Sequence, residues 1–166
     1  MGVVDVKSTT ITNRDAVPQV RNSALTQSGM VQECADTLEI TTANSSASTY
    51  RFFSIPSNAR MSSLAIHSDD CGTATAADFG LYETTENGGA VKDADFFKAA
   101  QSLNGGALSG TELAFGNVLV AEKIQYPIWQ ALGLSADPCK HYDVCMTLTA
   151  DSDVGGTVSL RARFVK

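Results

Sequence analysis

The clearest hydrophobic pattern lies near the C-terminus, where apolar and polar residues alternate in two stretches. In residues 141–150 one face carries Tyr142, Val144, Met146 and Leu148, and in residues 157–166 one face carries Val158, Leu160, Ala162 and Phe164. A period of two predicts β-strands with one buried face each. A polar loop at residues 151–156 separates them, so we predict a β-hairpin.

Further strands are predicted upstream, at residues 37–42, 50–55, 60–68 and 77–84. Alternation in residues 60–68 places Ser62, Leu64 and Ile66 on one face and Met61, Ser63, Ala65 and His67 on the other. In residues 77–84 it places Phe79 and Leu81 opposite Gly80 and Tyr82. The run Asn87-Gly88-Gly89 then favours a tight turn. Residues 113–124 have room for one or two more strands.

Helical spacing is confined to two short segments. In residues 93–103, Phe96, Ala99, Ala100 and Leu103 recur at the spacing of one helix face, and Asp93 or Asp95 suits an N-cap. Residues 127–133 begin with Pro127 and end with Gly133, a pattern typical of one or two helical turns. We therefore predict a short helix in each segment.

The first 35 residues differ from the rest of the chain. They are small and polar, include Pro18, and show no sustained helical or strand period. Such a segment buries too little apolar surface to offset the entropy lost on ordering, so it is flexible in isolation or orders along another surface. Scattered valines, isoleucine and leucine favour the second possibility. We predict an extended N-terminal arm (residues 1–35) and a β-sandwich domain (residues 36–166).

The number of predicted strands gives the fold class. Six to eight strands with only short helices are typical of a mainly β protein in which two sheets pack as a sandwich. Jelly-roll-like or Greek-key strand order is preferred, because closing two sheets over one another protects most strand edges. Alternation does not reveal the order of the strands.

Composition narrows the classes of function. Twelve Lys and Arg against 18 Asp and Glu give a net charge of −6, which argues against nucleic acid, because its phosphates are bound through many cationic contacts. Charged residues make up 18% of the chain, below the roughly 25% of average soluble domains, as expected for a surface that a partner covers. No apolar run is long enough to predict a membrane span, and no signal peptide is visible.

Residues that could carry chemistry are sparse. The four cysteines, Cys34, Cys71, Cys139 and Cys145, lack metal-ligand spacing, so buried thiols are expected, although their even number leaves disulfides open. Cys139 lies near His141, but only one other histidine, His67, is present to complete a metal or catalytic site. Eighteen carboxylates leave a two-carboxylate hydrolase open as a minor alternative.

Two acidic runs could supply oxygen ligands to calcium. Asp69-Asp70 and Asp151-Ser152-Asp153 lack the spacing of an EF-hand loop, so we expect these carboxylates to cap turns. We predict that the protein is not an enzyme and has no metal or cofactor site.

Several longer motifs resemble a known group of proteins. Residues 50–64, YRFFSIPSNARMSSL, resemble the strand–PSNAR–strand segment of small virion proteins of tailed bacteriophages. Residues 77–84, 87–91 and 93–97 are similar to the next block of that group, residues 127–134 and 142–144 to its C-terminal block, and residues 11–16 to part of its arm. The likeness covers most of the chain.

The resemblance implies a structural role in a phage particle. It implies a capsid decoration (cement) protein, which binds the outer surface of the capsid and stabilises contacts between major capsid protein subunits. The implied partners are the major capsid protein and copies of this chain, without nucleic acid, membrane or cofactor. The implied location is the capsid surface of the virion, after synthesis in the bacterial host cytoplasm.

An alternative is a carbohydrate-binding or tail-associated receptor-binding β-sandwich module. Trp129 or Tyr82 would then stack on a sugar ring.

The predicted arm supplies the candidate protein-binding residues. Ile11, Val17, Val20 and Leu25 are the apolar residues we expect to insert into a partner surface. Fully extended, about 35 residues span roughly 100 Å, enough to reach neighbouring subunits or to add a strand to an exposed sheet edge.

Overall fold

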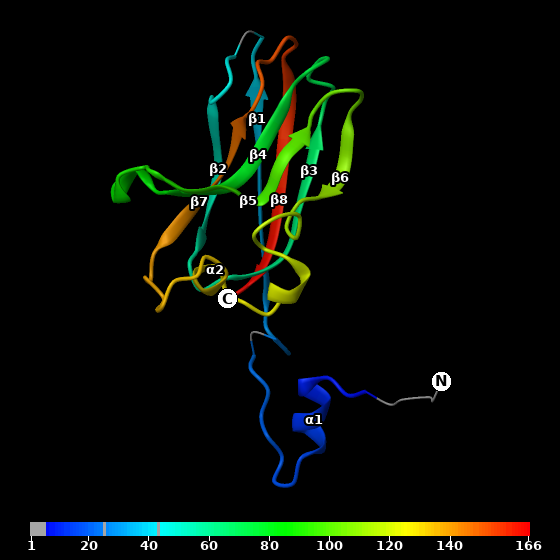
Figure 1. Ribbon diagram of the computed structural model, residues 1–166, viewed down its shortest axis with the longest axis vertical. Coiled ribbons are helices and arrows are strands. Elements are labelled where there is room, and N and C mark those ends of the chain that lie inside the picture. Colours follow the sequence, from blue (N-terminus) through cyan, green and yellow to red (C-terminus); the bar gives the residue numbers. More distant parts are fainter. Residues whose placement is uncertain (1–5, 25, 43) are drawn as a thin grey trace.

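The computed structural model of the protein describes residues 6–24, 26–42 and 44–166 (Figure 1). In chain order the elements are α1 (Thr9–Asp15), β1 (Val31–Ile40), β2 (Thr49–Pro56), β3 (Arg60–Ser68), β4 (Ala76–Glu83), η1 (Thr85–Asn87), β5 (Val91–Ser102), β6 (Leu108–Glu112), η2 (Ala121–Lys123), α2 (Ile128–Ala131), β7 (His141–Leu148) and β8 (Gly156–Val165). The architecture is mainly β with short helices, as the sequence predicts, but of the two α-helices only α2 lies where a helix is predicted. No helix in the described part of the chain is long and apolar enough to cross a membrane.

The strands form two four-stranded antiparallel sheets that pack as a sandwich. Their orders are β1-β8-β3-β6 and β2-β7-β4-β5. The first strand pairs with the eighth, the second with the seventh, the third with the sixth and the fourth with the fifth. This is the jelly-roll-like order of a ribbon of strand pairs folded over on itself, and it confirms the predicted fold class.

The predicted hairpin between the last two strands is wrong. Both strands and both buried faces are where alternation places them, but β7 lies in one sheet and β8 in the other. Residues 149–155 therefore cross between the layers of the sandwich. Alternation depends only on which face of a strand is buried, so it gives no information about which strand lies beside it.

The predicted helix at residues 93–103 is also wrong, because this segment is strand β5. Its pairing with β4 shifts register three times, and between Phe79↔Lys98 and Leu81↔Asp93 it contains three more residues than β4. Such bulges let the consecutive Phe96 and Phe97 both be buried. The apolar positions of this strand therefore depart from a period of two and resemble the spacing of a helix face. The bulge passes so close to Gly80 that a Cβ atom there would lie 2.1 Å from the Asp93 carbonyl oxygen.

Residues 113–124 hold no strand, contrary to the prediction. Beyond β6 they form turns and η2, and their polar groups bond to the bulged part of β5. The Gly116 and Leu119 N–H groups donate to the Phe97 and Phe96 carbonyls, and Asn117 Nδ2 donates to the Asp95 carbonyl at 2.8 Å. The irregular segment therefore satisfies backbone groups that the bulge removes from the ladder.

A bulge also changes one predicted strand face. β3 pairs with β8 through a register shift between Met61 and Ser63, so Met61 points into the core together with Leu64 and Ile66. Strict alternation places Met61 on the opposite face. The bulge inserts one extra residue into β3. The side chains of the residues before it therefore point to the opposite face from the one that strict alternation predicts.

The core fills the space between the two sheets. Leu64, Phe79 and Leu81 are wholly buried there, and the Phe96 and Phe97 rings meet edge to face with centroids 5.0 Å apart. Burying a side chain of this size contributes about 1.5–3 kcal/mol, so this layer stabilises the sandwich.

One predicted helix and one predicted turn are present, and the first strand begins earlier than predicted. Pro127 is the N-cap of α2, which confirms a short helix within residues 127–133, and β4 and β5 meet through a turn at Gly88 and Gly89. β1 begins at Val31, six residues before the predicted strand at residue 37 and inside the predicted arm. The division at residue 35 stays a prediction.

Candidate protein-binding surface

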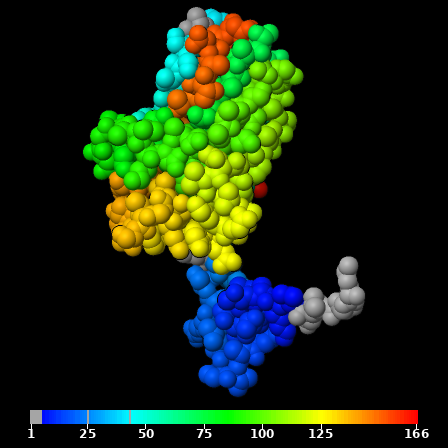
Figure 2. Space-filling view, in the orientation of Figure 1, coloured from blue at the N-terminus to red at the C-terminus, as the bar shows by residue number. Residues whose placement is uncertain are grey.

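Residues 6–30, here called the N-terminal segment, project from one end of the sandwich (Figures 1 and 2). They are not extended throughout, because α1 occupies Thr9–Asp15 with Ser8 as its N-cap. α1 has no buried residue. None of the described residues of the segment is buried, so they form no apolar core of their own.

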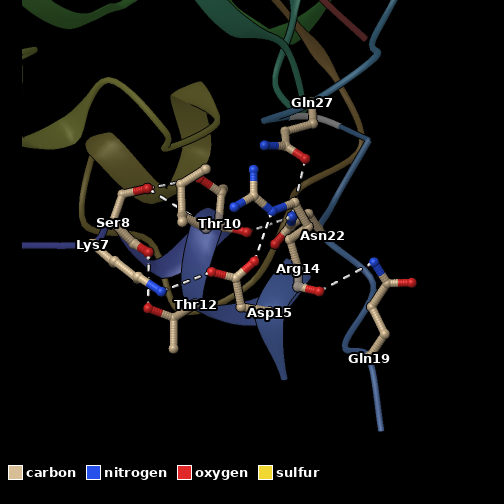
Figure 3. A network of polar contacts seen from close by, with 10 residues as sticks. Lys7, Ser8, Thr10, Thr12, Arg14, Asp15, Gln19, Asn22 and Gln27 are labelled. Atoms are coloured by element: carbon tan, nitrogen blue, oxygen red, sulfur yellow. Dashed lines mark hydrogen bonds and ion pairs between the residues drawn. The ribbon is translucent and has the colours of Figure 1, made fainter. Parts of the chain in front are cut away.

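Polar side chains hold the N-terminal segment together (Figure 3). Asn22 lies at the centre: its Nδ2 donates to the Thr10 carbonyl at 3.2 Å and to Gln27 Oε1 at 3.0 Å, and its Oδ1 accepts from Asn13 at 2.8 Å. These bonds fold the coil after α1 back against the helix. The bonds to Asn13 and Thr10 are partly buried and the bond to Gln27 is exposed, and each contributes roughly 0.5–1.5 kcal/mol net.

Two cations bind the carboxylate at the end of α1. Arg14 Nε and Lys7 Nζ lie 2.8 and 2.9 Å from the Asp15 carboxylate oxygens, and together they lower the pKa of Asp15 below its usual range, with Arg14 the larger cause. All three side chains are exposed, and surface ion pairs of this kind are weak and screened by salt. These ion pairs therefore contribute little to the stability of the segment.

The structure brings together only part of the predicted set of apolar contact residues. Ile11 and Val20 line one shallow hollow of about 540 Å³ within the N-terminal segment. Val17 lies outside that hollow and is 97% exposed, and Leu25 falls outside the described residues. No observation tests whether these residues bind a protein, so that role stays a prediction.

The end of the sandwich beside this segment carries a second apolar surface, which sequence reasoning missed. Met30, Val31, Ile124 and Tyr126, here called the base patch, are 79%, 56%, 47% and 39% exposed. Val31 pairs with Val165, Val165 pairs with Arg60, and Arg60 Nη1 donates to the Ile124 carbonyl at 3.4 Å, so the strand pairing brings these residues to the same end of the sandwich. Its residues are far apart in sequence, and only the strand pairing brings them together.

A hollow of about 410 Å³ lies between the base of the sandwich and the N-terminal segment. It is lined by Ser23, Thr26, Asn58, Gln125, Tyr126, Pro127, Trp129 and Gln130. The backbone N–H of Trp129 donates to the Ser57 carbonyl at 3.0 Å. This bond fixes α2 against the turn between β2 and β3 and so positions Trp129 at the hollow. An aromatic pair surrounded by amides suits an apolar or sugar-like group.

Tyr82, the other predicted sugar-stacking residue, is unavailable for that role. It is only 8% exposed, the Arg51 guanidinium lies 5.3 Å from its ring centroid, and its hydroxyl shares a 2.6 Å hydrogen bond with Thr147. Arg51 also lies 2.7 Å from Asp143 and donates to the Glu83 and Gly89 carbonyls. This network ties β2 to β7 and to the β4–β5 turn, and it has a structural role.

The cysteines and histidines form no reactive cluster in the described part of the chain. All four cysteines are free thiols, and burial raises the pKa of the Cys145 thiol to about 12 and also raises the pKa of Cys71. A thiol with a raised pKa is a poor nucleophile. His67 and His141 are both exposed, as predicted for solvated positions on strands.

The acidic runs cap turns, as the sequence predicts. Asp69 accepts from the Thr157 N–H at 3.0 Å, Asp151 from the Ser46 N–H at 2.7 Å, and Asp153 from the Thr73 hydroxyl at 2.7 Å. Among the described residues no group of three or more His, Cys, Asp or Glu is arranged to hold a metal ion.

Comparisons with known proteins give similarity at the level of fold. No protein-family model and no curated protein sequence matches the chain. The fold is similar to a chain of the capsid of Ralstonia phage GP4, with a TM-score of 0.55 and 17% identity over 83% of this chain and 85% of that chain. It is also similar to a chain of the cyanophage Pam1 capsid asymmetric unit, with a TM-score of 0.50 and 12% identity over 82% and 85% of the two chains. At these identities the likeness shows a shared fold.

Proposed function

We propose that this protein is a structural component of a phage capsid, and more specifically a decoration protein that binds the outer surface of the shell and stabilises contacts between major capsid protein subunits. The observation that carries the proposal is the fold shared with chains of two phage capsids over more than four-fifths of each chain. The motif resemblance to small virion proteins supports the same role. The proposal assigns no reaction to the protein.

The N-terminal segment and the base patch are the proposed contact surface. They lie at the same end of the molecule, and their exposed valines, methionine, isoleucine and tyrosine offer apolar area that a shell would remove from water. Burial of apolar area drives most protein association, at roughly 25 cal/mol per Å² before the costs of ordering. A protein that binds only the assembled shell adds its binding free energy at every site it occupies.

The test is binding of purified protein to capsids of the phage whose genome encodes it, prepared without this protein. Full-length chain is compared with a variant that lacks residues 2–28, which keeps Gly29 packed on Val165 and β1 intact. We expect the full-length chain to cosediment and to raise the temperature at which the shells open, and the shortened chain to lose most of its occupancy. Absence of cosedimentation by the full-length chain would contradict the proposal.

Point variants separate the two parts of the contact surface. Val17→Asp and Tyr126→Asp each place a charge in a proposed contact without disturbing the core, and we expect each to reduce occupancy. Glu86→Gln, on the exposed η1 turn, is the matched control and should bind as the unaltered protein does.

The hollow beside Trp129 favours a second candidate function, in which the sandwich binds a carbohydrate receptor. Trp129 and Tyr126 supply aromatic faces, and Asn58, Gln125 and Gln130 supply amides that can bond sugar hydroxyls. A glycan array with the isolated protein tests it. Specific binding that is lost in Trp129→Ala, with the same unfolding midpoint, would favour this candidate over capsid decoration.

A further inference from the structure

One edge of the sandwich is open to a further strand. Of the other edge strands, β6 has only five residues, β2 has a bulge and ends at Pro56, and β5 shifts register three times. Short length, bulges and proline stop an edge from accepting another strand. β1 has none of these features, because it makes ten consecutive pairs with β8 without a register shift and contains neither proline nor glycine.

The backbone groups that point away from β8 belong to the odd-numbered residues of β1. The Thr157 carbonyl and N–H both bond Asp69 on the β3 side of β8, so the even-numbered residues of β8 bond toward β1. Their partners in β1 are also even-numbered. The N–H and C=O groups of Glu33 and Ala35 therefore point outward, whereas the outward Thr37 N–H already donates to Asp36 Oδ1 at 2.8 Å.

The same half of β1 stands clear of the opposite sheet. Residues 31–37 are exposed except for Cys34, which is half-buried. A strand laid along this half therefore meets the outward groups of β1 without displacing a side chain of the core.

Two arginines of β8 lie behind this edge, and one of them has no carboxylate. Glu33 binds Arg163 Nε at 2.6 Å through Oε2 alone. Arg161 pairs with Ala35 on one side and Ala65 on the other, and within the described residues it makes no ion pair.

The carboxylate in the same row on β6 is already bonded. Glu112, opposite Ala65, accepts from the Leu64 and Ala114 N–H groups and from the Ser63 hydroxyl. The edge thus presents a carboxylate with one open oxygen at residue 33 and an unpaired guanidinium behind residue 35.

These two charges match those of a second copy of the same strand. When two copies of β1 pair antiparallel about a two-fold axis at Cys34, Glu33 lies opposite Ala35 of the copy, and their outward backbone groups meet. The next residue in that row is Arg161 of the copy. It lies two strand spacings, about 10 Å, from Glu33, with only the methyl group of Ala35 between them.

Other registers lack this match. An axis at Glu33 places the two Glu33 carboxylates opposite each other, which is destabilising. An axis at Ala35 places Glu33 opposite Thr37, whose row continues to Ser159 and offers no cation. The pairing about Cys34 is therefore favoured by charge as well as by the direction of the backbone groups.

We propose that this chain forms a two-fold dimer through the outer edges of β1, with the axis at Cys34. Glu33 and Ala35 of the two copies exchange backbone hydrogen bonds, and each Glu33 carboxylate lies between Arg163 of its own chain and Arg161 of the copy. The dimer goes beyond the proposed function and does not rest on it. Because pairing covers the edge at Val31, a residue of the base patch, the dimer competes with the proposed capsid contact.

The first test is sedimentation velocity of the reduced full chain over a range of concentrations. We expect a monomer–dimer equilibrium. Glu33→Lys places a cation between Arg163 and the copy's Arg161, so we expect the dissociation constant of the dimer to rise about tenfold or more. Glu86→Lys makes the same change of charge on the exposed η1 turn and is the matched control, which should dimerise as the unaltered chain does. Thermal unfolding checks that both variants remain folded.

Cys34 reports the register of the pairing. In the proposed dimer the two Cys34 residues occupy a non-hydrogen-bonded pair, in which the Cα atoms are about 4.5 Å apart and can be joined by a disulfide. Diamide, which takes up the two electrons and two protons of the thiols, should therefore link Cys139→Ser, which lacks the exposed thiol, into a covalent dimer. The double variant Cys34→Ser, Cys139→Ser should stay unlinked.

Three outcomes would overturn the proposal. They are a chain that stays monomeric at its highest soluble concentration, a dimer that gives no Cys34 cross-link, and a dimer that Glu33→Lys leaves unchanged. The proposed function fails separately: capsids that bind a strictly monomeric chain leave capsid decoration standing, and a Cys34-linked dimer of a chain that binds no capsid leaves the β1 contact standing.

Discussion

In the sandwich, side chains such as Leu64 and Phe79 are wholly buried between two sheets, whereas α1 in the N-terminal segment has no buried residue at all. The sandwich is stabilised by apolar area that its own chain removes from water. The N-terminal segment is held by amide and carboxylate contacts on its surface, around Asn22 and Asp15. The comparison shows that the sandwich is stabilised by a buried apolar core, whereas the described part of the N-terminal segment is held mainly by polar contacts.

The two regions also differ in charge. Residues 1–30 contain three basic and two acidic side chains, while residues 31–166 are strongly acidic. The first 30 residues are therefore weakly cationic and the rest of the chain is anionic. This difference makes the two contacts separable by salt and by charge-changing substitutions.

The largest expected effect comes from the core. Phe79→Ala leaves a cavity between the sheets, and we expect a loss of about 3–5 kcal/mol in the free energy of unfolding, measured by urea denaturation. The matched substitution in the other region, Val17→Ala, should change it by less than about 0.5 kcal/mol, because Val17 is 97% exposed. Comparable losses for the two variants would contradict the division between the regions.

An aspartate paired with arginine occurs in each region, and the two should behave differently. Asp143→Ala removes a half-buried partner of Arg51 and Ser54, and we expect a loss of about 1–3 kcal/mol. Asp15→Ala removes a fully exposed partner of Arg14 and Lys7 and should leave the unfolding midpoint unchanged. Thermal unfolding at moderate salt measures both, and a large effect of Asp15→Ala would show that the N-terminal segment supports the sandwich.

A smaller, pH-dependent effect is expected at Asp93 on β5. Desolvation, together with neighbouring Asp95, raises the pKa of Asp93, while Lys123 acts in the opposite direction. When folding raises the pKa of a carboxyl, its ionisation destabilises the folded protein. The free energy of unfolding therefore falls as the pH rises from the ordinary pKa of the group through the raised one. Asp93→Asn should therefore be more stable than the unaltered protein at neutral pH, with the gap closing as the pH falls below the ordinary range of an aspartate. A gap that does not change with pH would rule out this carboxyl as its source.

The smallest effect on stability is expected from removing most of the N-terminal segment. The variant without residues 2–28 should unfold at the same urea concentration as the full chain, because none of the described residues that it removes belongs to the core. Limited proteolysis of the full chain should cut first in the coil at residues 16–23 and leave the sandwich intact. Early cleavage within β3 or β8 would contradict this expectation.

Much of the fold could be predicted from residues 141–150 and 157–166, where every second side chain is apolar. Two of the errors fall where bulges break the period of two. Phe96 and Phe97 face the same core from a bulged strand, and Met61 turns inward before a bulge in β3. The base patch could not be predicted, since only the pairing of β1, β8 and β3 brings Val31 and Ile124 to the same end of the sandwich.

The sequence alone determined the strands near residues 50–55, 60–68, 77–84, 141–150 and 157–166, the buried faces of β7 and β8, the tight turn at Gly88 and Gly89 and the helical turn after Pro127. These are local properties, set by side-chain alternation and by the backbone preferences of glycine and proline. The tertiary structure decided that β7 and β8 lie in opposite sheets, that residues 93–103 are a strand, and that β1 is an open edge. Those features depend on hydrogen bonds and contacts between segments far apart in the chain. A local sequence pattern gives no information about the free energy of these contacts.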